Sequence, residues 1–83
     1  MPSGEVRIEL LIEDLDFLDV LYKSLLPELK EFHTKRGRMD ISREHNKLVI
    51  LIEGIDLSIL RALVNSALRL IGATLETLYC LFR

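Results

Sequence analysis

The sequence predicts an α/β fold of the α+β type, a two-layer sandwich with three mainly antiparallel strands and two helices on one face of the sheet. Three observations lead to this prediction. Residues 5–13 alternate apolar and polar side chains, as a strand with one solvated face does. Residues 38–52 contain two strand-like segments separated by turn-forming residues. From residue 57 nearly to residue 83, apolar side chains recur at helical spacing without a proline.

The first helix is expected to begin near Asp14, whose side chain can accept hydrogen bonds from the first backbone N–H groups. Apolar side chains then recur at helical spacing until Pro27, which disfavours continuation of the helix. Residues 28–37 are expected to form a charged connection, with the option of an extra turn anchored by Leu29 and Phe32.

The next two strands are expected to form a hairpin. Residues 38–43 place Met39 and Ile41 inward, and residues 44–47 supply turn-forming side chains. Residues 48–52 are apolar on both sides, so this strand is predicted to lie at the protected centre of the sheet. The order strand, helix, strand, strand, helix makes the first connection a crossover over that central strand.

The whole chain, residues 1–83, is expected to be one domain, because a chain this short has no material for a second core. Hydrophobic residues make up 49% of it, which is high for a small domain with a large surface-to-volume ratio. Some apolar surface is therefore expected to contact a partner.

The long C-terminal helix, which Asp56 can cap, carries a narrow polar stripe and an apolar arc wider than one sheet face requires. The stripe consists of Ser58, Arg61, Asn65, Arg69, Gly72 and Glu76. The inward face is expected to contain Leu60, Val64, Ala67, Leu68, Ile71, Leu75, Leu78 and Phe82, with Ile59, Leu63, Leu70 and Leu81 beside it.

The same helix is too long for its sheet. At 1.5 Å per residue, about 26 helical residues span about 39 Å, whereas a strand of about seven residues spans about 23 Å. The end of the helix should overhang, and leaving Leu78, Leu81 and Phe82 in water would forgo roughly 1.5–3 kcal/mol each relative to full burial. The alternative is that the helix breaks near Gly72 and its tail folds back onto the sheet.

We therefore predict that the long helix binds a partner. Its arginines could form charge-assisted hydrogen bonds while Asn65 and Ser66 allow close packing, and ordinary solvation of the polar stripe is the alternative. The predicted partner-binding residues are Ile59, Arg61, Leu63, Asn65, Ser66, Arg69, Leu70, Leu78, Leu81 and Phe82.

No arrangement of residues predicts an enzyme, a metal site or a cofactor. The sequence has no Gly-rich phosphate loop, no paired carboxylates in an evident cleft and no nucleophile with a placed base. His33 and His45 are expected to be solvated turn residues, because a stable metal site needs three or four converging donors. Cys80 is expected to be a buried small apolar residue.

Basic residues concentrate in the middle of the chain, although the net charge is only −2. Cations near a loop and an edge strand can touch phosphates without reading sequence. No aromatic side chains interleave them to stack bases, so nucleic-acid contact, solubilisation and protection of the edge strand all remain open. The candidate residues are Lys35, Arg36, Arg38 and Arg43.

The sequence predicts a cytoplasmic protein without membrane contact. No uninterrupted apolar run approaches the roughly 20 residues of a membrane span. Residues 1–6 lack the basic and apolar regions of a signal peptide, and a single cysteine cannot form an intramolecular disulfide.

Three segments share a pattern with a known family: the stretch IDLSILRALVNSALRLI, the strand KLVILIEG before it, and the Leu-Pro-Glu expected to follow the first helix. Together they resemble the Pcc family (CTAG/Pcc-like) of dimerisation subunits of the KEOPS complex, over nearly the whole chain. The matching positions are Pro27, Glu28, Asp56, Ser58, Leu60, Arg61, Asn65, Ser66 and Arg69.

This resemblance implies a single Pcc-like domain that dimerises and uses its helices to hold the catalytic subunit of the KEOPS complex. That subunit transfers threonylcarbamoyl to adenosine beside the tRNA anticodon, and the present chain would act as a scaffold without catalysing the reaction. The basic central residues would then give a weak or indirect tRNA contact. Family members often carry an aromatic after Asn-Ser and another after the helix arginine, where this chain has Ala67 and Leu70.

Two alternatives to a homodimeric scaffold remain open. The chain could be a divergent paralogue that forms a heterodimer with the standard Pcc subunit. It could also be a small RNA-binding module that uses the basic central segment.

Overall fold

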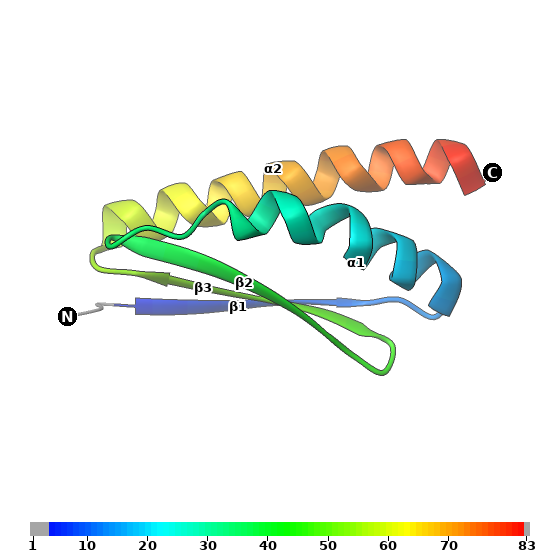
Figure 1. The fold of residues 1–83 in the computed structure, drawn as a ribbon, viewed down its shortest axis with the longest axis horizontal. Helices are drawn as coiled ribbons and strands as arrows, with labels where there is room; N and C mark the ends of the chain where they lie inside the picture. Colours follow the sequence, from blue (N-terminus) through cyan, green and yellow to red (C-terminus); the bar gives the residue numbers. More distant parts are fainter. Residues whose placement is uncertain (1–3, 83) are drawn as a thin grey trace.

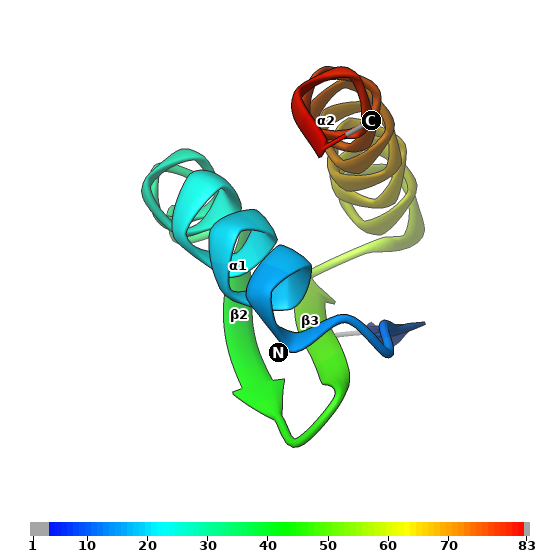
Figure 2. The same ribbon diagram turned by 90° about the vertical axis from the view of Figure 1, so that its right-hand side faces the viewer.

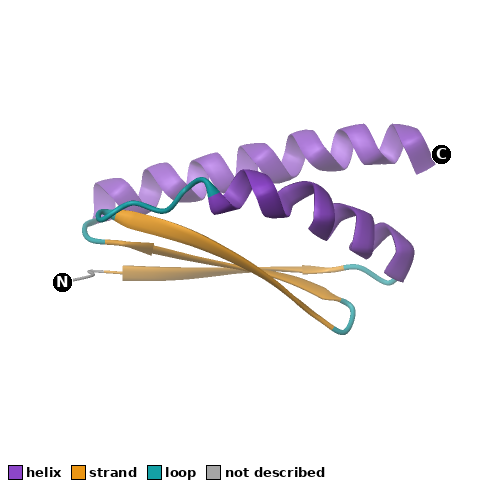
Figure 3. Cartoon of the chain, in the orientation of Figure 1, coloured by secondary structure: helices purple, strands orange, loops and turns teal. Residues whose placement is uncertain are grey.

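The computed structural model describes residues 4–82, with the side chain of Phe82 excepted, and it confirms the predicted order of elements (Figure 1). The three strands form one layer, and the two helices form a second layer over one face of the sheet (Figure 3). The α+β prediction is therefore confirmed. The elements are β1 (Gly4–Leu11), α1 (Leu15–Lys30), β2 (Gly37–Glu44), β3 (Lys47–Gly54) and α2 (Leu57–Phe82).

The sheet is antiparallel throughout, with the strand order β1-β3-β2. β3 is the central strand, as its apolar sequence predicted. Ile50 of β3 lies opposite Ile8 of β1 and Ile41 of β2, so the three isoleucines form a row across the sheet. α1 connects the two edge strands and lies above β2, while α2 lies beside α1 on the same face (Figure 2).

The core lies between the sheet and the helices. α1 contributes one fully buried leucine per turn, and each such burial is worth roughly 1.5–3 kcal/mol relative to exposure. β3 contributes its helix-facing side chains, and α2 adds fewer buried residues than the shorter α1. The buried cluster consists of Leu18, Leu21, Leu25, Leu29, Met39, Leu48, Ile50, Ile52, Ala67, Ile71 and Leu78.

Aspartates begin both helices, as predicted. The Asp14 carboxylate accepts hydrogen bonds from the backbone N–H groups of Asp16 at 3.0 Å and Phe17 at 3.2 Å. The Asp56 carboxylate accepts one from the backbone N–H of Ile59 at 2.9 Å. Each cap satisfies donors that the first turn of a helix leaves without an intrahelical partner.

α1 does not end at Pro27, so that prediction is wrong. The helix continues through Pro27 to Lys30. A proline in a helix interior costs about 3 kcal/mol or more. Leu25 and Leu29 on either side of it are fully buried, and their packing on the sheet offsets this cost.

The hairpin turn is tighter than predicted. β2 ends at Glu44 and β3 begins at Lys47, so two residues connect the strands. His45 in this turn has a φ of 48°, the left-handed conformation that two-residue hairpin loops require.

The sheet face that carries no helix is covered by ion pairs. Val49 of β3 projects to this face and is only 1% exposed. Beside it, Arg7 Nε lies 2.6 Å from Glu9 Oε2, and Lys47 Nζ lies 3.4 Å from Glu9 Oε1. Arg7 also pairs with Glu44 across the sheet at 3.5 Å. Long charged side chains can cover apolar surface in this way, which explains why a strand apolar on both sides suits this position.

The end of β3 packs directly on the first turns of α2. A Cβ added at Gly54 would meet the backbone nitrogen of Leu60 at 3.0 Å and its Cα at 3.1 Å. A Cβ added at Gly72, within α2, would meet nothing within 4 Å. The two glycines therefore occupy opposite environments.

We expect Gly54→Ala and Gly72→Ala to change stability in opposite directions. Gly54→Ala should lower the free energy of unfolding by about 1–3 kcal/mol, because the backbone of Leu60 must shift. Gly72→Ala should raise it by roughly 1 kcal/mol, because alanine favours the helix and the space around it is open. Urea unfolding measures both, and a stabilising Gly54→Ala would contradict the close packing of β3 on α2.

Candidate functional site

The surface that distinguishes this domain is the part of α2 that its own sheet does not cover. α2 has 26 residues, whereas each strand has eight, and its last turns extend past the hairpin end of the sheet (Figure 1). The helix is continuous through Gly72, so the alternative of a break there is wrong. Among its described residues, four large apolar side chains are more than half exposed: Leu57 by 66%, Leu68 by 52%, Tyr79 by 70% and Leu81 by 73%.

Three of these four side chains, Leu57, Leu68 and Tyr79, lie on one side of α2. Leu57, Arg61, Leu68, Gly72 and Tyr79 are spaced by three or four residues, or by multiples of a turn, and so share one strip that we name the open flank. The opposite flank carries Ser66, Leu70 and Ala73, which line a shallow depression beside the end of α1.

A groove of about 860 Å³ opens beside the C-terminal half of the open flank. Its walls are mainly apolar, and carboxylates stand at its rim. α1 and the connection before it supply one wall and α2 the other. The lining residues are Ile12, Glu13, Asp14, Phe17, Gly72, Leu75, Glu76 and Tyr79. Sequence reasoning missed Leu57, Leu68 and Tyr79 as surface residues, although their spacing along one strip was available as a signal.

Leu68 and Leu78, both assigned to the inward face of α2, differ in exposure in the structure. Leu68 was expected to face inward but is half exposed, because the sheet covers a narrower arc of α2 than predicted. Leu78 was expected on the inward face but also in the overhang that a partner would cover; it is 5% exposed and belongs to the domain's own buried cluster. Leu78 is therefore not accessible to a partner in this conformation.

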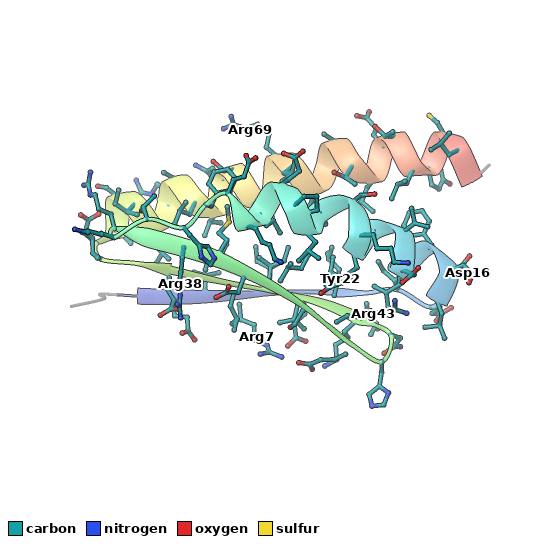
Figure 4. The ribbon with its side chains drawn as sticks, in the orientation of Figure 1. Arg7, Asp16, Tyr22, Arg38, Arg43 and Arg69 are labelled. Carbon is teal, nitrogen blue, oxygen red and sulfur yellow. The ribbon has the colours of Figure 1, made fainter. Side chains whose placement is uncertain are left out.

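The other predicted partner-binding residues divide by exposure. Arg61, Asn65 and Arg69 are exposed, as the polar stripe predicted, and Arg69 points away from the sheet in Figure 4. Ser66 is half-buried. Leu81 is exposed, whereas the side chain of Phe82 lies outside the described residues. The last three, which are partly buried against the domain itself, are Ile59, Leu63 and Leu70.

Three of the four basic candidates for nucleic-acid contact, Lys35, Arg36 and Arg38, line one open pocket of about 240 Å³ at the start of β2, whereas Arg43 lies apart from them. Arg38 lies on the sheet face without helices, with its Nε 2.8 Å from Glu53 Oε1 (Figure 4). This hydrogen bond to Glu53 raises the pKa of Arg38. Arg43 is neutralised elsewhere, because its Nη1 lies 2.8 Å from Asp19 Oδ1 of α1. Lys35 and Arg36 lie exposed in the loop before β2, and within residues 4–82 no ion pair involves either of them.

The remaining polar candidates show no catalytic arrangement. His33 and His45 are exposed, as predicted, and the His33 Nε2 lies 3.1 Å from the Met39 carbonyl oxygen. Among the described residues no three His, Cys, Asp or Glu side chains gather to hold a metal ion. Cys80 is exposed, so its predicted burial is wrong: its spacing places it on the same side of α2 as the exposed Arg69 and Ala73.

α2 also bears on the expectation of no membrane contact. By length and hydropathy alone, Leu57–Leu81 could cross a membrane, which the search for an uninterrupted apolar run did not foresee. A helix that packs on its own protein can have the same composition. α2 is such a helix in part, because Ala67, Ile71 and Leu78 are buried against the domain.

The family model described as "Transcription factor Pcc1" matches residues 5–79, from β1 to the last turns of α2. The chain belongs to the Pcc1 family. A Pcc1 relative from Pyrococcus abyssi (strain GE5 / Orsay), the "KEOPS complex subunit Pcc1", is 37% identical over 76 residues. The match covers 92% of this chain and 90% of the relative. The resemblance to the Pcc family is thereby confirmed, and the Pcc1 match includes the whole open flank.

The ion pairs of Asp19 make a pH-dependent contribution to stability that can be measured. Hydrogen bonds from Lys23 and then Arg43 lower the pKa of the Asp19 carboxyl. We expect Asp19→Asn to reduce the free energy of unfolding at neutral pH. A lowered pKa means that this contribution is complete above the ordinary aspartate value of about 3.9 and is lost as the pH falls through the folded-state value.

Chemical unfolding of the wild type and Asp19→Asn across this pH range tests the prediction. Glu31→Gln is the control, because it removes an exposed carboxylate for which no described cation forms an ion pair. A difference between wild type and Asp19→Asn that grows toward acidic pH would contradict the pairing.

Proposed function

We propose that this chain is a non-catalytic scaffold subunit of a KEOPS complex and acts in the cytoplasm. The observation that carries the proposal is the match, over 92% of the chain, to a protein named as a KEOPS complex subunit.

The physical support for a scaffold is the exposed apolar surface of α2. Leu57, Leu68, Tyr79 and Leu81 are each more than half exposed. Fully burying such a side chain gains roughly 1.5–3 kcal/mol, so a partner that covers this surface gains binding free energy from it. Depletion of charge along the open flank, where Arg61 is the one charged member, is typical of the centre of an interface.

In the finer form of the proposal, the helices hold the catalytic subunit of the complex. The chain would thereby support threonylcarbamoyl-adenosine modification of tRNA without taking part in the chemistry. Asn65 and Arg69 of the polar stripe are exposed, so they could form hydrogen bonds that orient such a partner.

Pairing with a second Pcc subunit is the other part of the proposal, either as a homodimer or as a heterodimer of a divergent paralogue with the standard subunit. The chain departs from the family pattern at Ala67 and Leu70, and the burial of these residues bears on the choice between a homodimer and a heterodimer. Ala67 is fully buried and Leu70 partly buried against the domain. Both positions face the domain's own core, so these two departures lie outside the open flank, which stays available to either kind of partner.

Mixing the purified chain with a KEOPS catalytic subunit, with and without the standard Pcc subunit, tests the proposal. We expect a complex in size-exclusion chromatography with light scattering in at least one of the mixtures. Failure to join the catalytic subunit, alone or through the standard Pcc subunit, would contradict the scaffold function.

Leu81→Glu should weaken the association about tenfold or more, because it places a charge on an apolar contact surface. Leu81 is 73% exposed, so the fold should be retained, whereas Leu63→Glu would also disturb a side chain packed against the core. Ser42→Glu on the far face of the sheet adds the same charge and should leave binding unchanged. Equal binding by the wild type, Leu81→Glu and Ser42→Glu would exclude this end of α2 from the interface.

The second candidate function is RNA binding through the loop before β2. The observation that favours it is that Lys35 and Arg36 are exposed without an ion pair within the described part of the chain. Arg38 and Arg43 contribute less, because carboxylates already neutralise them.

We expect any RNA binding by the isolated chain to fall steeply with salt and to be lost in the variant Lys35→Ala with Arg36→Ala. Each phosphate contact removed should reduce the slope of log K against log salt by about one unit. The variant Arg38→Ala with Arg43→Ala is the matched control and should lose less affinity. Fluorescence polarisation with a short RNA measures both, and the reverse order would refute the assignment of the loop.

A further inference from the structure

Three basic side chains from the middle of the chain line one open pocket, which we name the loop pocket. It lies between the loop before β2 and the turn from β3 to α2, and its volume is about 240 Å³. Pockets that enclose a drug-sized ligand have roughly 300–1,000 Å³, so the loop pocket suits a single chemical group. Its cations are Lys35, Arg36 and Arg38, and Glu53 is the one carboxylate among the residues that line it.

The backbone around the loop pocket is held from several sides. The Thr34 hydroxyl accepts hydrogen bonds from the backbone N–H groups of Arg36 at 3.1 Å and Gly37 at 3.2 Å. The backbone N–H of Ile55 donates to the Arg36 carbonyl oxygen at 2.9 Å, which ties the loop to the turn before α2 (Figure 3). A Cβ added at Gly37 would meet Leu63 Cδ1 at 2.7 Å, so the loop packs closely under α2. A ligand therefore needs little further ordering of this loop, which favours binding.

The cations of the loop pocket are only partly neutralised. Within residues 4–82, neither Lys35 nor Arg36 forms an ion pair. The Nε of Arg38 lies 2.8 Å from Glu53 Oε1 and 3.6 Å from Asp40 Oδ2. Three lining cations stand against one lining carboxylate, so the pocket has a net positive charge of two and favours an anion with two negative charges.

A terminal phosphate group matches this charge. A phosphate monoester carries about −1.5 to −2 charges at pH 7, and its oxygens accept strong hydrogen bonds from arginine and lysine. Each phosphodiester of a nucleic-acid backbone carries one negative charge. The loop pocket should therefore prefer the end of a phosphorylated molecule to the middle of a polynucleotide.

We propose that the loop pocket binds a single terminal phosphate group. Lys35 and Arg36 are its main donors, and Arg38 is a third donor whose charge Glu53 partly offsets. Free phosphorylated small molecules and the phosphorylated end of an RNA offer the same group. The proposal rests on the second candidate function, because both use this loop, and it adds the group that is recognised and the role of Glu53.

Titration of the full-length chain with inorganic phosphate at constant ionic strength tests the site. Two-dimensional NMR should show saturable shifts of the backbone amide signals of Gly37 and Ile55. The variant Lys35→Ala with Arg36→Ala should lose about tenfold or more in affinity, because it removes hydrogen bonds to a charged group. The absence of a saturable shift would overturn the proposal.

The matched control for this variant is Lys23→Ala with Lys30→Ala. It removes two exposed cations that do not line the pocket, so it lowers the net charge of the chain equally. Its affinity for phosphate should stay within about twofold of the wild type, since exposed charges at a distance contribute little. An equal loss in both variants would mean that phosphate responds to the overall charge, and it would overturn the site.

Glu53→Gln tests the effect of the carboxylate on the incoming anion. Glutamine keeps an oxygen that can accept from Arg38 and removes the negative charge, so phosphate should bind about threefold more tightly. Asp40→Asn is the control, because Asp40 lies near Arg38 but does not line the pocket, and it should change the affinity less. A merely structural carboxylate would give unchanged or weaker binding in Glu53→Gln, which would overturn its assigned role.

Two short RNAs of one sequence, with a 5′-phosphate and with a 5′-hydroxyl, distinguish the two sources of the group. If an RNA end is the source, the phosphorylated RNA should bind about threefold or more tightly in fluorescence polarisation, and inorganic phosphate should compete with it. Saturable phosphate binding with equal affinities for the two RNAs assigns the pocket to a free phosphorylated molecule. RNA binding that depends on Lys35 and Arg36 without any phosphate binding would overturn this inference and leave the second candidate function standing.

Discussion

The structure depends on one constraint: a sheet of three strands, each eight residues long, has to bury one side of a 26-residue helix. The sheet succeeds for the central part of α2, where Ala67 and Ile71 are buried, and for Leu78. It cannot reach the last turns or the open flank. The exposed leucines and the groove beside Tyr79 follow from this difference in size.

Different groups cover the apolar side chains on the two faces of the sheet. The helices cover one face, whereas ion pairs among Arg7, Glu9 and Lys47 lie over the other and leave Val49 only 1% exposed. The pairs at Arg38 and Arg43 also remove two of the four cations that the central sequence offered to a nucleic acid. α2 therefore remains as the main surface available to a partner.

Periodicity predicted the elements well, because the alternation in β1, the apolar run of β3 and the helical spacing of α2 are local properties. Errors arose where the outcome depended on neighbours in space. Pro27 did not end α1, since buried leucines on both sides hold the turn in place. Leu68 was misplaced, because spacing gives the direction of a side chain around the helix but not the edge of the sheet beneath it. The burial of Cys80 was predicted from the general preference of cysteine, although the residue lies on the exposed side of α2. In the basic group, Arg43 lies toward the other end of β2 from Lys35, Arg36 and Arg38, which gather around the start of that strand.

The unburied strip along α2 has a consequence for how this chain behaves as a population of molecules. A partner that binds only the folded form adds to its stability by mass action, in proportion to the logarithm of partner concentration. The melting temperature should therefore rise with the amount of partner present. In a cell, copies made in excess of their partners would expose this apolar strip to chaperones and proteases. Degradation of the unbound copies would then keep the amount of the subunit close to the amount of its partners.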